Sequence, residues 1–154
     1  DRRYNHRMYY TTTKDFTSFS TTRLLIDPGF NVIDATIFKA SRNKWGMVLK
    51  DETLSPPQKN LKLTFSQSLY KGWSAPGEPI TGKVWAEGPS IIKVEDRWLI
   101  YFDKYMDKKY GAISSADLIQ WQDISEKVFF PEGARHGTVL KVPLAVYEKL
   151  LKAQ

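Results

Sequence analysis

Two kinds of segment recur along this chain at intervals of roughly fifty residues, and an internal repeat restricts the fold more than any other sequence feature. The first kind places a polar residue directly before a strand-like run, at residues 34–39, 87–93 and 136–141. The second kind is a small polar turn that ends in an aromatic residue, at residues 13–19, 66–73 and 114–121. A repeat of about fifty residues with about four strands has the size of one β-propeller blade.

Short runs rich in β-branched and aromatic residues fill the repeats, and turn residues interrupt them about every ten positions. The strands predicted from these runs are residues 7–13, 35–39, 45–50, 61–65, 90–94 and 97–102. The segment 143–152 differs, because its apolar residues recur at three- and four-residue steps between Pro143 and Lys152, as in a capped helix. The sequence therefore predicts an all-β fold of propeller blades with a short C-terminal helix.

Composition limits the partners that a chain like this can have. The 154 residues fit a single domain, residues 1–154, and 42% of them are hydrophobic, which is enough for a packed core. The 23 lysines and arginines are interleaved with 17 acids, which indicates a solvated surface and no nucleic-acid partner. No run approaches the roughly eighteen apolar residues of a membrane helix, and the polar start lacks the apolar core of a signal peptide. We therefore expect no membrane partner, while the absence of cysteine leaves the compartment open.

The polar residues that open the first kind of segment are Asp34, Glu87 and His136. Asp34 and Glu87 each precede a tryptophan by eleven positions, which supports their equivalence. In a propeller the innermost strand of each blade lines the central channel, so that equivalent positions surround one axis. We therefore expect these three side chains to converge, and charged side chains in such a place are rarely buried unless they are paired or used.

Two carboxyl groups beside a glycosidic bond are the minimum equipment for its hydrolysis. We assign the general acid to Glu87, because Gly88 and the proline after it fix the backbone and Trp85 supplies an apolar surrounding. Carboxylates clustered in a channel raise one another's pKa, which would keep Glu87 protonated near neutral pH. An alternative stays open, in which Asp34 and Glu87 cap strand ends or pair with Arg135 and lysines.

Other conspicuous residues are interpreted as structural. The tryptophans outside the Glu87 motif pack between sheets in most proteins of this type, and we assign them no function: Trp45, Trp73, Trp98 and Trp121. Asp117 is expected to accept hydrogen bonds from nearby backbone donors in its turn.

Four motifs stand in order along nearly the whole chain: Ile33-Asp34-Ala35, Glu87-Gly88-Pro89, Asp117-Leu118 with Trp121, and Arg135-His136-Gly137-Thr138-Val139. Together they resemble glycoside hydrolase family 43. The turn motif alone is shared with related sucrose- and fructan-cleaving propellers, whereas the combination of the other three is more specific.

The resemblance implies a five-bladed propeller and inverting hydrolysis of arabinofuranosides or β-xylosides in plant-type polysaccharides. It matches Glu87 with the acid, Asp34 with an aspartate that tunes the pKa of the acid and orients substrate, and His136 with an axial histidine. It implies no required cofactor, and a structural calcium ion near His136 is a further expectation. His136, Arg135 and Trp85 are the remaining candidates for substrate contact.

The resemblance is incomplete, because the family's base aspartate has no counterpart that we find here. Counting units gives the outer strands of one blade, two whole blades and the inner strand of another, which is about half of a five-bladed ring. Three explanations stay open. The chain is the C-terminal part of a longer enzyme, as its abrupt start and helical finish favour, or a processed product that self-associates to complete its packing, or a smaller β-sandwich with similar strands.

The expected function is therefore that of a glycoside hydrolase acting on an oligo- or polysaccharide, with the base supplied from outside this chain. The alternative is a non-catalytic carbohydrate-binding or structural propeller fragment that lacks the base. The substrate class favours an extracellular or periplasmic location.

Overall fold

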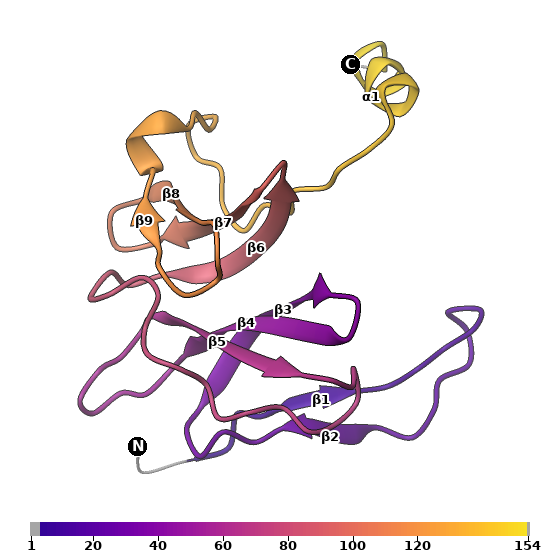
Figure 1. Ribbon diagram of the computed structural model, residues 1–154, viewed down its shortest axis with the longest axis vertical. Coiled ribbons are helices and arrows are strands. Elements are labelled where there is room, and N and C mark those ends of the chain that lie inside the picture. Colours follow the sequence, from indigo (N-terminus) through magenta and orange to yellow (C-terminus); the bar gives the residue numbers. More distant parts are fainter. Residues whose placement is uncertain (1–3, 154) are drawn as a thin grey trace.

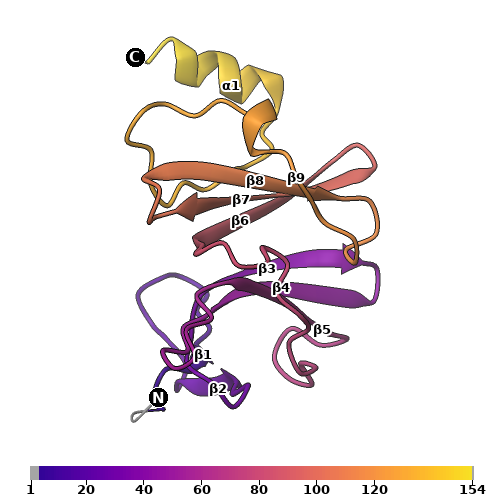
Figure 2. The same cartoon turned by 90° about the vertical axis from the view of Figure 1, so that its left-hand side faces the viewer.

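The computed structural model describes residues 4–153, and their strands form three antiparallel sheets that stack one on another (Figures 1 and 2). Every sheet joins strands that follow one another in the chain. The sheets are β1–β2 (Met8–Tyr10, Arg23–Ile26), β3–β4–β5 (Val32–Ser41, Lys44–Asp51, Leu61–Ser66) and β6–β7–β8–β9 (Glu87–Val94, Arg97–Lys104, Lys109–Ser115, Gln122–Asp123). A short 3₁₀ helix, η1 (Ser125–Lys127), and one α-helix, α1 (Leu144–Leu151), follow.

The sheets are blades of a partial propeller. The last sheet has four strands, the full number for a blade. In the middle sheet the segment 74–80 runs beside β5 as an irregular fourth strand, since the backbone N–H groups of Ser74, Gly77 and Ile80 donate to β5 carbonyls at 2.9, 2.9 and 2.8 Å. The prediction of an all-β fold of propeller blades with a short C-terminal helix is confirmed.

Apolar clusters lie between successive sheets and hold the stack together. Phe38 of β3 and Trp98 of β7 pack with ring centres 5.0 Å apart, in a cluster shared by the last two sheets. A second cluster joins β2 to the middle sheet through Ile26, Met47 and Leu49. Three of the tryptophans assigned to packing lie in or against these clusters: Trp73, Trp98 and Trp121.

The second kind of repeated segment forms the same turn in two sheets. Asp15 Oδ1 accepts hydrogen bonds from the backbone N–H groups of Thr17 and Ser18, both at 2.9 Å. Asp117 Oδ1 accepts from Ile119 and Gln120, both at 2.8 Å. The prediction that Asp117 satisfies local backbone donors is confirmed, and the repeat seen in the sequence is a repeat of turn geometry.

Two predicted strands differ from the structure. Residues 7–13 form a shorter strand, Met8–Tyr10, and beyond it only an isolated bridge between Thr13 and Phe19 continues the pairing. Residues 136–141 were expected to form the inner strand of a further blade but form no strand. No neighbouring strand pairs with them among the described residues, and their N–H groups find side chains instead: Gly137 donates to the Tyr110 hydroxyl and Val139 to Ser90 Oγ at 3.0 Å.

The predicted helix is confirmed at α1, which follows Pro143 and carries Lys149 in its last turn. No residue of α1 is buried, and the helix projects away from the sheets (Figures 1 and 2). Among residues 4–153, no helix has the length and apolar character needed to cross a membrane.

A phenylalanine ring covers a glycine on the neighbouring strand in both larger sheets. Phe38 pairs with Gly46 across β3–β4, and Phe102 pairs with Gly111 across β7–β8. A Cβ added at Gly46 would overlap the Phe38 ring, and one at Gly111 would lie 3.0 Å from Phe102. Glycine is therefore required at these positions so that the ring can lie flat on the neighbouring strand and reach the core.

We expect Gly46→Ala to lower the free energy of unfolding by about 1–3 kcal/mol, because the new methyl group displaces the Phe38 ring from a packed core. Urea denaturation followed by tryptophan fluorescence measures this. Gly77→Ala is the matched control, since its Cβ would lie 3.8 Å from the nearest atom, the Leu63 carbonyl oxygen. Equal losses in the two variants would contradict the packing of Phe38 over Gly46.

Candidate functional site

Three side chains that the sequence places at one repeat position meet in the structure. Asp34 lies near the start of β3, Glu87 begins β6, and His136 lies in the segment between η1 and α1. One donor atom of each lies within 4.8 Å of the other two. His136 Nε2 is 3.0 Å from Glu87 Oε1, and the Gly88 N–H donates to Asp34 Oδ2 at 3.0 Å. The two sheets and the later segment therefore contribute one polar group each to a common cluster.

The backbone leaves regular β-geometry at each of these places. The φ angles of Asp34, Gly88 and His136 are 52°, 56° and 47°, which lie in the left-handed region. Strand pairing shifts register between Ile33 and Thr36 and again between Glu87 and Ser90. Such bulges re-aim a side chain out of the alternation of a strand. The bulges at the starts of β3 and β6 thus accompany the approach of Asp34 and Glu87, whereas His136 reaches them from a segment outside any strand.

A buried lysine that the sequence analysis did not single out completes one side of the cluster. Lys50, next to the last residue of β4, is 2% exposed, and its Nζ lies 3.0 Å from Glu87 Oε2. The same Nζ lies 2.9 Å from Glu52 Oε2, and Glu52 in turn pairs with Lys59. Lys59, Glu52, Lys50 and Glu87 therefore form a continuous chain of alternating charges.

Arg135 and Asp103 complete the other side. Arg135 Nε donates to Asp103 Oδ2, and Arg135 Nη2 lies 3.6 Å from Glu87 Oε1. Asp103 is fully buried and lies opposite Glu87 in the β6–β7 strand register. Its Oδ1 has no hydrogen-bond partner among residues 4–153. The contacts left open as an alternative for Glu87, with Arg135 and a lysine, are therefore present in the structure.

These contacts set the protonation of Glu87. Burial works to raise its pKa, but hydrogen bonds from His136 and Lys50, together with the charge of Lys50, outweigh burial and hold the pKa of Glu87 below its ordinary value. Burial also works to lower the pKa of Lys50, and its hydrogen bonds to Glu52 and Glu87 overcome this and raise it. The expectation that clustered carboxylates raise the pKa of Glu87 is not met in this chain, because cations alternate with the carboxylates.

Trp85 lies beside the cluster with part of its indole exposed. Its ring packs at a tilt against Tyr105, with ring centres 6.1 Å apart, and Lys50 Nζ lies 4.6 Å from the centre of the Tyr105 ring. Trp85 also lines a hollow of about 590 Å³ with Gln58, Asn60 and Lys83. An apolar face thus adjoins the charged cluster.

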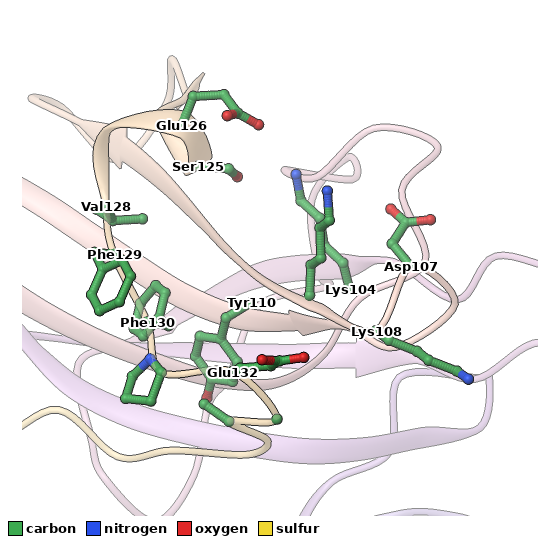
Figure 3. Close-up of a pocket in the computed structure, with 14 residues that line it drawn as sticks. Lys104, Asp107, Lys108, Tyr110, Ser125, Glu126, Val128, Phe129, Phe130 and Glu132 are labelled. Atoms are coloured by element: carbon green, nitrogen blue, oxygen red, sulfur yellow. The ribbon is translucent and has the colours of Figure 1, made fainter.

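A second hollow of about 550 Å³ lies between the β7–β8 turn and the segment after η1 (Figure 3). The rings of Phe130 and Tyr110, whose centres are 4.6 Å apart, line one side, and Asp107 and Lys108 lie on the other (Figure 3). None of the five site residues predicted from the sequence lines it. Tyr110 links it to the cluster, since its hydroxyl contacts the backbone of Gly137, next to the histidine.

The sequence carried a signal for the two residues that were missed. Lys50 and Asp103 each follow a run of strand residues, and they are 53 positions apart, the same separation as Asp34 and Glu87. Charged residues that stand at equivalent positions of successive units, directly after an apolar run, are candidates for lining the central channel, because equivalent positions surround one axis.

Asp34, Glu87 and His136 lie close enough together to hold a metal ion. Calcium takes about six to eight oxygen ligands, whereas this group offers two carboxylates and a nitrogen. Both oxygens of Glu87 already contact cationic or hydrogen-bonding partners in Lys50, Arg135 and His136. Among residues 4–153, this group therefore does not fit a calcium ion bound to Glu87, and the expected calcium ion stays a prediction.

The separation of the two carboxylates limits their roles. An inverting acid and base lie about 6.5–9.5 Å apart, so that a water molecule fits between base and sugar. Asp34 and Glu87 bring oxygens within 4.8 Å of each other. This close approach of single oxygens does not favour Asp34 as the water-activating base of an inverting pair with Glu87.

Comparisons with known proteins agree with this fold. Residues 1–148 match the model of a family described as a probable glycosyl hydrolase domain related to family 43. The chain is similar to the crystal structure of a thermostable family-43 glycoside hydrolase, with 17% identity and a TM-score of 0.52 over 88% of this chain and 58% of that one. This likeness shows a shared fold, and the chain spans less than two thirds of that protein's length. No curated protein matched the chain.

We expect Gly88→Ala to displace His136, because the added Cβ would lie 3.0–3.3 Å from the imidazole ring at a φ of 56°. Gly82→Ala is the matched control, since Gly82 has a φ of 58° and nothing within 4 Å of an added Cβ. Both variants lose stability through backbone strain, about 1 kcal/mol. Only Gly88→Ala should lose more and move the His136 ring signals in NMR spectra; identical behaviour of the two would contradict the contact.

We expect stability to fall on acidification partly through Glu87. Its folded pKa lies below its ordinary value of 4.5, so its stabilising effect is full above about pH 4.5 and is lost as the pH falls through the folded pKa. Glu87→Gln should therefore flatten the decline of urea midpoints below pH 4.5, while Glu52, whose pKa is also lowered, keeps part of the slope. Glu148→Gln on the exposed helix α1 is the control. An unchanged slope in Glu87→Gln would contradict the ion pair.

Proposed function

The chain belongs to the family of probable glycosyl hydrolase domains related to glycoside hydrolase family 43, and from this premise we propose that it hydrolyses arabinofuranosides or β-xylosides of plant-type polysaccharides. Glu87 is the general acid that protonates the leaving oxygen. Asp34 tunes the pKa of Glu87 and orients the sugar. The base that activates water comes from residues outside this chain.

The observation that carries this proposal is the meeting of Glu87 with Asp34 and His136 within 4.8 Å. Polar side chains from separate repeat units share one place, although packing alone would put apolar groups there. The Gly88 N–H donates to Asp34 Oδ2 at 3.0 Å, which orients the second carboxylate beside the proposed acid.

The proposed acid must bind a proton before it can donate one. In this chain Lys50 and His136 keep the pKa of Glu87 low. A base carboxylate across the sugar would add negative charge, and a bound sugar would exclude water; both effects raise the pKa of a nearby carboxyl group. The same residue that is ionised here is then a proton donor once substrate and base are in place.

The remaining candidates bind rather than react. Trp85 is partly exposed beside the cluster, and a sugar ring can pack on an exposed indole through its C–H groups. Arg135, whose side chain is 51% exposed, and His136 present donors for sugar hydroxyls.

A second candidate function is carbohydrate binding without turnover. It is favoured by the occupation of both Glu87 oxygens by Lys50 and His136, which suits a structural ion pair as well as an acid. This candidate predicts that sugars bind and are released unchanged.

The decisive measurement compares glycosides with good and poor leaving groups. We expect the protein to act on aryl α-L-arabinofuranosides or aryl β-xylosides. Glu87→Ala should reduce kcat/KM about 10²–10⁴-fold on an unactivated oligosaccharide and much less on an activated aryl glycoside, which needs little proton donation. Glu95→Ala in an exposed turn is the control.

Two additions separate the candidates. Azide, which is already an anion, replaces water that would need a base, so turnover should rise when azide is added. NMR of the first-formed product should show inversion, whereas retention would make Asp34 a nucleophile, since retaining pairs lie about 5–5.5 Å apart. A folded protein that binds xylo- or arabino-oligosaccharides in calorimetry but never releases product, with or without azide, would support binding alone.

A further inference from the structure

Lys50 is the most deeply buried lysine of the described chain, and its position is unusual for a cation. It is 2% exposed, whereas lysine is almost never fully buried unless paired. Its Nζ contacts two carboxylates, Glu87 at 3.0 Å and Glu52 at 2.9 Å. The ring of Tyr105, 4.6 Å away, covers a further side.

The ion pair between Lys50 and Glu87 crosses from one sheet to the next. Lys50 is the second-to-last residue of β4 in the middle sheet, and Glu87 begins β6 in the last sheet. A salt bridge on a solvent-exposed surface contributes little, but breaking a buried pair leaves an uncompensated charge and is costly. The lysine is therefore held by the same packing that joins the two sheets, and it fixes Glu87 relative to both.

The two oxygens of Glu87 have different surroundings as a result. Oε2 accepts from Lys50, while Oε1 faces His136 at 3.0 Å and Arg135 at 3.6 Å. Lys50 is buried, whereas the side chains of His136 and Arg135 are 48% and 51% exposed. Oε1 therefore lies on the side of the carboxylate that a ligand can reach.

The other charged groups near Glu87 come from every element around it. Asp34 reaches it from β3, Asp103 from β7, and Glu52 and Lys59 from the segment after β4. Tyr105 lies in the β7–β8 turn. Lys50 is the one cation among these described groups that contacts Glu87 from the buried side.

We propose that Lys50 is a positioning residue for Glu87: by holding Oε2 in a buried ion pair, it leaves Oε1 as the oxygen that carries and delivers the proton. The catalytic meaning of this role rests on the proposed function, in which Glu87 is the acid. The positioning itself does not, because it follows from the contacts of Lys50 with Glu52 and Glu87. Because Lys50 also pairs with Glu52, the negative charge of Glu52 limits how strongly Lys50 stabilises the ionised form of Glu87.

The experiment is an NMR titration of the Glu87 side-chain carboxyl carbon in protein labelled with ¹³C-glutamate, with the signal assigned by its loss in Glu87→Gln. Lys50→Met should raise the titration midpoint by about one pH unit or more, because an adjacent cation is lost. Lys50→Arg should restore most of the shift. Glu52→Gln should move the midpoint in the opposite direction, since a nearby negative charge is removed and Lys50 pairs with Glu87 alone.

Lys62→Met is the matched control. Lys62 lies on the neighbouring strand, is largely buried, and has its own ion pair with Asp51 at 2.8 Å. Its loss should leave the Glu87 midpoint in place. Circular dichroism and urea midpoints show which variants are folded, and if Lys50→Met unfolds, Glu52→Gln, whose side chain is partly exposed, carries the test.

An unchanged Glu87 midpoint in folded Lys50→Met, an equal shift in Lys62→Met, or a rise in Glu52→Gln would each overturn the proposal. Where the protein turns over a glycoside, the basic limb of kcat/KM should move with the NMR midpoint. If the protein hydrolyses no glycoside but the titration midpoints of Glu87 shift as expected, the proposed function is wrong and the positioning role of Lys50 is supported.

Discussion

The packing of the β3–β4–β5 sheet against the β6–β7–β8–β9 sheet is the interaction on which the rest of this molecule depends. Phe38 and Trp98 meet across it, and Ala86, directly before Glu87, is fully buried in the same cluster. Glu87 therefore lies directly at the edge of the apolar core. Because burial of apolar surface is the main favourable contribution to folding, the placement of the cluster follows from the core and not from the charges.

Within that frame, charges of opposite sign alternate. Lys50 lies between Glu52 and Glu87, and Arg135 lies between Glu87 and Asp103, so that two cations neutralise three acids that could not otherwise be ionised so close together. This alternation has a chemical cost for an acid catalyst, since it favours the ionised form of Glu87. The same contacts hold the Glu87 carboxylate in one orientation, and a fixed orientation favours reaction with a bound substrate.

Much of the fold could be predicted because the repeat is visible in local chemistry. The turns at Asp15 and Asp117 have the same hydrogen bonds, so similar residues at similar spacing gave a correct reading. The expected strand at residues 136–141 failed for a reason outside its own sequence, since a strand needs a paired neighbour and the described chain offers none there. Whether a strand finds a hydrogen-bonded neighbour depends on the tertiary structure and cannot be predicted from a run of residues with high β-propensity.

The cluster was predictable in part for a similar reason. Asp34, Glu87 and His136 share a repeat position, and the structure brings them together. Lys50 was missed because a lysine at the end of a strand is usually solvated, and its burial depends on how two sheets pack. The direction of the Glu87 pKa was missed with it, because the sign of a shift depends on neighbours that only the tertiary structure supplies.

The left-handed backbone at Asp34, Gly88 and His136 has a consequence for how such a site can diversify. In β3 and β6 a bulge frees residues next to Asp34 and Glu87 from the rule that alternate side chains of a strand face the core. The polar side chain at a bulge can therefore change without changing which other residues of the strand face the core. The cost of such a change lies in the ion pairs that are lost, as at Glu87, and not in the alternation of the strand.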